Sequence, residues 1–368
     1  MRYLRLCLVA AAACAALLAP AASAVVLKTV SGHRFSLRFR AGHSTANGLS
    51  AVTTGASGTK AASVGDVRWR GGPVLHSEHP YLVFWAPAGH SIPSSSRTVL
   101  ARYMSDVATD SGGVDNVYGV LSQYADSAGA ATYAQTFGGA QVINDGHRYP
   151  ANDGGCSVDP GTTACVSDAQ VQAEVARLIS ADRLPSGVGA GAPIYFVITP
   201  QDVNVCFAAG ACSSNVFCAY HDFFTDNGSP VLYSPVPFTV WANGSTKGCQ
   251  DDGTAVYQTP DLGSQASFHG DHAYQIADNL SHELSETITD PLLNAWFNNN
   301  GSEVGDLCEA FAPMSKPEKD VSANAYLPIV AGTESAGDLV DQFFTGDYYY
   351  NQTEWSNATG DCMATPTT

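Results

Sequence analysis

The segment SHELSETITDP, Ser281 to Pro291, carries residues of the types that hold metal ions. In the HExxH pattern of zinc hydrolases, two histidines one helical turn apart bind zinc, and the glutamate between them activates water. Here His282 takes the first ligand position, Glu283 takes the water-activating position, and Glu286 stands where the second histidine would be. Because a carboxylate is also a zinc ligand, the segment predicts a metal site of the form HExxE.

The residues around this motif have the spacing of an amphipathic helix from about His272 to Thr289. At about 100° per residue, His282 and Glu286 share the polar side, one turn apart, with Glu283 on its flank. An ordinary helix with a solvated polar face, binding nothing, has the same pattern. The opposite, apolar side collects Ala273, Ile276, Ala277, Leu280, Leu284, Thr287 and Ile288.

A catalytic zinc needs a third protein ligand and an open position for water. The downstream stretch SEVGDLCEAF offers two carboxylates for this role, Glu303 and Asp306, and Cys308 could pin the stretch by a disulfide. Asp290 is a weaker candidate because it precedes Pro291, where we expect it to close the helix or start a turn. The sequence leaves the choice between Glu303 and Asp306 open.

The first residues predict export. Two arginines, Arg2 and Arg5, precede an apolar run that ends in AASA at Ala24, which is typical of a secretory signal peptide over residues 1–24. No later stretch reaches about 18 uninterrupted apolar residues, so we expect no membrane span. The chain is therefore predicted to be secreted, to the extracellular space or the periplasm.

The cysteines agree with an oxidising compartment. Two of the ten, Cys7 and Cys14, lie in the predicted signal, and eight follow it. An even number in an exported chain predicts disulfides, and the lack of a CxxC pair argues against a cysteine-ligated zinc. We expect Cys156–Cys165 as a local bridge and Cys308–Cys362 as a tie between the tail and the segment after the helix.

Charge and missing motifs exclude several functions. The net charge is −17 and no cluster of lysine or arginine occurs, so nucleic acid and anionic membrane surfaces are not expected partners. The chain has no GxSxG elbow of serine hydrolases, and it lacks the P-loop and dinucleotide-binding fingerprints.

Strand and helix patterns alternate along the chain and predict an α/β fold. Buried strands are expected at PYLVFWAP (80–87), AQVIND (140–145) and APIYFVITP (192–200). Helices are expected from SSSRTVLARYMSDVATDSGG and from VSDAQVQAEVARLISADRLP, the latter capped by Ser167 or Asp168. The prediction is a mixed sheet of about four or five strands with packed helices, braced by disulfides, with the zincin-like HEL helix along the floor of a cleft.

These elements suggest a simple domain organisation. Residues 67–368 are predicted to form a single α/β domain, with a cysteine-rich insertion at about 201–268. Residues 25–66 begin with a possible strand, HRFSLRFR, and continue as a Gly/Ser/Thr/Ala-rich stretch that reads as a flexible segment or propeptide.

Several motifs together resemble the EXORDIUM, or phosphate-induced, family of exported plant and microbial proteins. The resemblance spans about residues 68–310 and includes a HELxE helix followed by a segment of the form E-[IV]-x-D-L-C-E. It implies secretion and an important HELSE segment. Plant members tend to have Asn in place of Asp290, which argues against that residue as a required ligand. The motifs are GGPVL (71–75), IYFVITPQDV (194–203), CAYH with Phe223, SHELSETITDPLLNAW (281–296) and EVGDLCE (303–309).

The resemblance also draws attention to His221, in CAYHDFF. This histidine could be a metal ligand or could polarise a bound carbonyl, and it could equally be a loop residue packed against Phe223 and Phe224.

Two functional hypotheses follow. The first is a secreted, zinc-dependent, peptidase-like hydrolase, in which His282, Glu286 and either Asp306 or Glu303 hold the metal. Glu283 would then be the general base, with His221 as a further catalytic residue. The second is a non-catalytic extracellular protein of the EXORDIUM type that acts on a cell-wall polymer or a signalling partner, with a structural ion such as calcium or with none.

Overall fold

The computed structural model describes residues 66–143, 148–159, 161–238, 273–309, 339–345 and 347–366, with the backbone of three short strands before residue 52. The predicted signal peptide, residues 1–24, lies outside the described residues, as does most of the segment 25–66. Every candidate site residue named above lies inside them.

The fold is built around a mixed eight-stranded sheet in the order β3-β1-β2-β11-β12-β8-β5-β6. Strands β12, β8, β5 and β6 are parallel to one another, whereas β11, β2, β1 and β3 pair antiparallel with their neighbours. The predicted α/β class is confirmed, with a larger sheet than expected. The strands are β1 (Leu27–Lys28), β2 (Arg34–Phe39), β3 (Ser50–Ala51), β5 (Glu78–Trp85), β6 (Gly139–Ile143), β8 (Ala192–Ile198), β11 (Phe217–Asp226) and β12 (Ser229–Pro235).

The extra strands come from two places that sequence analysis treated as peripheral. The β11–β12 hairpin lies within the stretch 201–268 predicted as an insertion, yet β12 pairs with β8 in the middle of the sheet. Strand β2, predicted from HRFSLRFR, pairs with β11 and places Ser36 opposite His221. His221 is thus a strand residue and not a loop residue.

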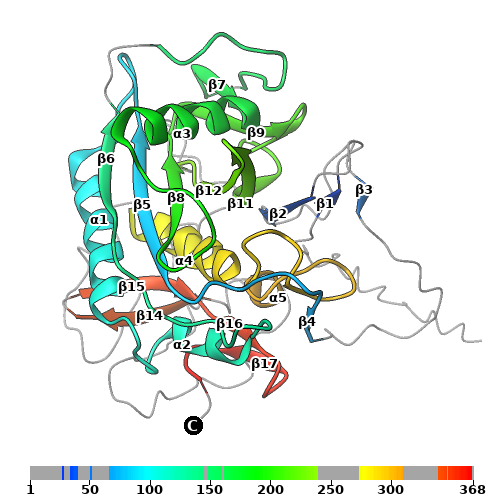
Figure 1. The fold of residues 1–368 in the computed structure, drawn as a ribbon. Coiled ribbons are helices and arrows are strands. Elements are labelled where there is room, and N and C mark those ends of the chain that lie inside the picture. The colour runs from blue at the N-terminus through cyan, green and yellow to red at the C-terminus, as the bar shows by residue number, and fades with distance from the viewer. Residues whose placement is uncertain are drawn as a thin grey trace, which may run out of the picture.

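Two helices cover one face of the sheet and one covers the other (Figure 1). Helices α1 (Ser94–Thr109) and α4 (Ala273–Thr289) share a core with Leu82 and Phe84 of β5. The alternate residues Val83 and Trp85 join the core beneath α3 (Asp168–Asp182), as expected for side chains that alternate along a strand. All three predicted helices are confirmed.

The helix caps follow the sequence. Ser167 caps α3, because its Oγ accepts the N–H of Gln170 while the Gln170 side chain accepts the N–H of Ser167, which together form a capping box. The structure thereby chooses Ser167 over Asp168 as the cap.

Helix α4 is enclosed on both sides. Figure 1 shows it (yellow) between the central strands and the hairpin of β14 (Leu339–Phe344) and β15 (Asp347–Gln352). Two further elements come later in the chain. They are the short helix α5 (Asp306–Glu309) and the hairpin of β16 (Glu354–Ser356) and β17 (Asp361–Met363). The remaining elements are β4 (Arg68–Trp69), α2 (Val117–Val120), η1 (Leu121–Gln123), β7 (Ala164–Ser167), β9 (Val203–Ala208), β10 (Ala211–Cys212) and β13 (Trp296–Phe297).

Disulfides brace this arrangement, as is typical of proteins from oxidising compartments. Both expected bridges, Cys156–Cys165 and Cys308–Cys362, are confirmed, and Cys206–Cys212 is a third. Cys218 is also disulfide-bonded. The Cys308–Cys362 bridge ties α5 to β17, so it holds the segment that carries Glu303 and Asp306 in place. Among the described residues, no helix is both long enough and apolar enough to cross a bilayer.

Candidate metal centre

The polar side of α4 is buried, and this overturns the interpretation of it as a solvated face. The side chains of His282, Glu283 and Glu286 are 0% exposed. They face β11 on one side and the segments of α5 and β15 on the other, so the helix has no water-facing polar stripe here. Burying an imidazole and two carboxylates is costly unless each is paired, and the pairs define the site.

The end of α4 agrees with the expected turn. Oδ1 of Asp290 accepts the backbone N–H groups of Asn294 and Ala295 at 2.5 and 2.6 Å. Asp290 therefore closes the helix before Pro291, as the sequence predicted, and one of its oxygens is already used by the backbone.

The first ligand group consists of His282, Glu286 and Asp306. Nε2 of His282 lies 3.3 Å from Oε2 of Glu286 and 3.6 Å from Oδ1 of Asp306. Two ligands that each lie about 2.1 Å from a tetrahedral zinc are about 3.4 Å from one another. The three side chains therefore already have the spacing that a shared ion requires.

The proton on His282 is placed by Gln352, the last residue of β15. The amide Nε2 of Gln352 donates to the carbonyl of Gly305 at 2.5 Å, so the amide oxygen must be the atom that faces the histidine. Nδ1 of His282 then donates to this oxygen at 2.9 Å. In the neutral form of His282, the lone pair of Nε2 then points at Glu286 and Asp306, which is the orientation of a metal-ligating histidine held by an outer partner.

Glu286 is held at its other oxygen. Its Oε1 accepts the backbone N–H of Asp306 at 2.9 Å, which leaves Oε2 toward the imidazoles. Gly305 makes this close approach possible: a Cβ at this position would lie 2.8 Å from Nδ1 of His282 and 3.0 Å from Oε1 of Glu286. Only a residue without a side chain fits between them.

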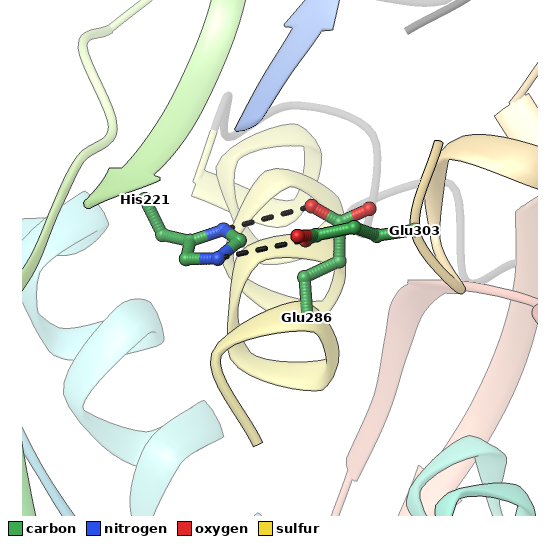
Figure 2. A group of neighbouring side chains, drawn as sticks. All are labelled: His221, Glu286 and Glu303. Carbon is green, nitrogen blue, oxygen red and sulfur yellow. Dashed lines mark ion pairs between the residues drawn. The ribbon is translucent and has the colours of Figure 1, made fainter. Parts of the chain in front are cut away.

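The second ligand group consists of His221, Glu286 and Glu303. Figure 2 shows His221 reaching from β11 toward the two carboxylates, one ring nitrogen facing each. Nδ1 lies 3.6 Å from Oε2 of Glu286, and Nε2 lies 3.5 Å from Oε2 of Glu303. Nδ1 is also 3.3 Å from Oε2 of Glu283. Glu286 thus belongs to both groups.

Charges in the cluster perturb the acids strongly. Burial raises the pKa of Glu303 well above its usual range, and the charges of Asp290, Glu286 and Asp306 raise it further. Burial also raises the pKa of Glu283, against the opposing effect of His221. For Glu286, burial alone would raise the pKa, but the charges of His282 and His221 outweigh it and lower the pKa to about 2.

All six predicted site residues meet in one place: His221, His282, Glu283, Glu286, Glu303 and Asp306. The sequence left open whether Asp306 or Glu303 is the third ligand. In the structure both residues belong to a ligand group, Asp306 to the first and Glu303 to the second. Sequence reasoning missed Gln352 and Gly305. The glycine was visible between Glu303 and Asp306, but Gln352 carries no local signal and reaches the site only through the fold.

No protein-family model, curated protein or solved structure matches this chain. The resemblance to the EXORDIUM family therefore stays a prediction, and the functional argument is made from the site itself.

Proposed function

We propose that this chain is a secreted, metal-dependent hydrolase of the peptidase type that acts on an extracellular protein or peptide. The single observation that carries the proposal is the position of His282 Nε2, which lies 3.3 and 3.6 Å from oxygens of two buried carboxylates. Such an arrangement is stable only with a cation or a proton between the groups. His282, Glu286 and Asp306 would hold the ion.

The donor set favours zinc over calcium. Calcium takes oxygen ligands, whereas both ligand groups include an imidazole nitrogen. Imidazole together with carboxylate is typical of zinc and other transition metals. When bound, a zinc ion lowers the pKa of water to about 7 and polarises a carbonyl.

Glu283 is positioned to act as the base. Its Oε2 is paired with His221, and within the described part of the chain no donor reaches its Oε1. Burial raises the pKa of this carboxyl, and a carboxylate with a higher pKa is a stronger proton acceptor. His221 would hold Glu283 in place and could polarise a bound carbonyl.

One observation favours the second candidate, a non-catalytic extracellular protein of the EXORDIUM type with a structural ion. The side chains of His221, His282, Glu283, Glu286, Glu303 and Asp306 are all 1% exposed or less. Structural zinc sites are closed, whereas catalytic ones keep a position open to water and substrate. Hydrolysis therefore requires the segments around α4 to open.

The test is turnover of an unstructured protein by the zinc-loaded chain and by Glu283→Gln. We expect the variant to keep its zinc and to lose activity by about 10²-fold or more, because Glu283 is not a ligand of the first group. The control is Glu174→Gln, which changes a carboxylate of α3 that pairs with Arg177 on the other face of the sheet. Equal turnover by wild type and Glu283→Gln would reject Glu283 as the base, and no turnover by either protein would reject the enzyme and leave the structural ion.

A further inference from the structure

An ion held by His282, Glu286 and Asp306 would leave buried polar atoms of His221 and Glu303 without a partner. His221 and Glu303 are 1% and 0% exposed. Within the described residues, no donor satisfies either carboxylate oxygen of Glu303 and no acceptor satisfies Nε2 of His221. The buried carboxyl of Asp290 lies within hydrogen-bonding reach of Glu303, but two ionised carboxylates cannot donate to one another. Buried polar atoms of native proteins are nearly always paired, so these three atoms indicate a missing partner.

The geometry shows what kind of partner fits. As a neutral imidazole with its Nδ1 proton directed at Glu283, His221 would present the lone pair of Nε2 to Oε2 of Glu303, which lies 3.5 Å away. This is again about the separation of two ligands on one tetrahedral zinc. Glu283 then takes the same place for His221 that Gln352 takes for His282, an outer acceptor that directs the ligating nitrogen.

The charges point the same way. The two groups and Glu283 bring together four carboxylates, Glu283, Glu286, Glu303 and Asp306. One divalent ion carries the charge to compensate two of these carboxylates, and a second ion would compensate the other two wherever protons do not.

From these observations, and resting on the proposed metal-dependent function, we propose that the site is dinuclear. The second divalent ion is held by His221 Nε2, Glu303 and Glu286, and Glu286 is the ligand shared by both ions. Oε2 of Glu286 lies 3.3 Å from Nε2 of His282 and 3.6 Å from the other ring nitrogen of His221, Nδ1. Ligand atoms of His221, Glu286 and Glu303 all lie within 4.8 Å of one another, which leaves room for a shared ion. In two-metal hydrolases the ions lie about 3.5–4 Å apart and clamp both sides of the reacting group.

The experiment is a metal count on the folded full chain. Zinc is added to chelator-treated protein, unbound metal is removed, and zinc per chain is measured. We expect about two ions for wild type and Glu174→Gln, and about one each for Glu303→Gln and Asp306→Asn. Glu286→Gln should lower the affinity at both positions. One ion in wild type, unchanged in Glu303→Gln, would overturn the proposal and would mean that protons, and not an ion, satisfy His221 and Glu303.

A second readout covers the case in which a variant does not fold. Wild-type chain is titrated with Mn²⁺ and followed by electron paramagnetic resonance. Two ions that share a carboxylate are spin-coupled, so the spectrum at two equivalents should not be twice the spectrum at one. A spectrum that saturates at one uncoupled ion would refute the dinuclear site. The outcome is separate from the hydrolase question: two ions without turnover reject only the enzyme, and one ion with turnover rejects only the second ion.

Discussion

Nδ1 of His282 and Oε1 of Gln352 lie 2.9 Å apart although the two residues are separated by 70 positions in the sequence. This hydrogen bond joins α4 to the end of β15 and determines which ring nitrogen can ligate. The same amide bonds the Gly305 carbonyl, and the Gln352 backbone N–H donates to Ser281 Oγ at 2.8 Å. Gln352 therefore connects helix, hairpin and ligand segment.

Replacing this amide should weaken metal binding without removing a ligand. We expect Gln352→Leu to lose about 10–100-fold in zinc affinity, because the tautomer and orientation of His282 are no longer held. Competition with a chromogenic chelator measures the affinity. Gln352→Glu, which keeps an acceptor for Nδ1, should retain most of it. Equal losses in both variants would mean that the acceptor for Nδ1 is not what the site needs from Gln352, and that its bond to the Gly305 carbonyl or its packing is.

Gly305→Ala should damage the site through contact alone. The added methyl would lie 2.8 Å from Nδ1 of His282, closer than real Cβ atoms come to a neighbour, so either the segment or the histidine must move. We expect zinc affinity to fall at least 10-fold and the free energy of unfolding to fall by about 1–3 kcal/mol. The matched control is Gly189→Ala, where a Cβ meets nothing within 4 Å. Similar behaviour of the two variants would contradict the close approach.

Removing the Cys308–Cys362 bridge should cost more than removing Cys156–Cys165. The bridges span 54 and 9 residues, which in the chain-entropy model correspond to about 4 and about 3 kcal/mol of the free energy of unfolding. Only the first should also weaken zinc binding, because it anchors α5. Double Cys→Ser variants, unfolded by denaturant with and without zinc, compare the two. If both lose the same amount of zinc affinity, α5 does not depend on its bridge.

Chelation should destabilise the wild-type chain. An ion that binds only the folded state at about 1,000 times its dissociation constant contributes about 4 kcal/mol. A chelator removes this contribution and leaves the buried carboxylates without counter-charge. We therefore expect a lower denaturation midpoint after chelation, restored by zinc. In His282→Ala the restored part should be smaller, and identical shifts in the two proteins would place the stabilising ion elsewhere.

Stability should fall with pH because of Glu78, at the start of β5. Burial raises the pKa of this carboxyl from 4.5 to about 8. Between these values the unfolded chain has lost the proton that the folded chain keeps, so raising the pH favours unfolding. At about 1.4 kcal/mol for each pKa unit, the loss amounts to about 3–5 kcal/mol. The contribution is fully present below pH 4.5 and is gone above pH 8.

The measurement for Glu78 is a difference between two proteins. The free energy of unfolding of wild type minus that of Glu78→Gln should decline across this pH window, because glutamine does not titrate. Other groups titrate equally in both chains and cancel. A difference independent of pH would show that Glu78 is ionised in the fold.

Local sequence patterns predicted the helix and the disulfide of this site, but not which segments pack around them. The period of apolar residues placed α4 correctly, and the pairing of Cys308 with Cys362 followed from a cysteine in the ligand segment and another near the end of the chain. The burial of the polar face was not predictable, because an amphipathic pattern does not reveal what covers the polar side. Here β11, α5 and β15 cover it.

The position of His221 shows the same limit. Cysteine, glycine and asparagine near 201–268 suggested loops, whereas FCAYHDFFTD forms a ten-residue strand, β11. Tyr220 points toward α3 and His221 toward α4, as alternation along a strand requires. The register against β2 and β12 depends on distant partners, so local sequence could not place His221 beside Glu303.

The burial of every donor around Glu286 has a kinetic consequence. An ion enclosed at this depth would leave only when the fold opens locally, so its residence time would follow the opening rate of the protein and not the strength of its ligand bonds. Loading of the folded chain would be limited by the same local opening. Exchange against isotopic zinc should accordingly accelerate when the 308–362 cross-link is reduced, by more than the loss of affinity at equilibrium accounts for.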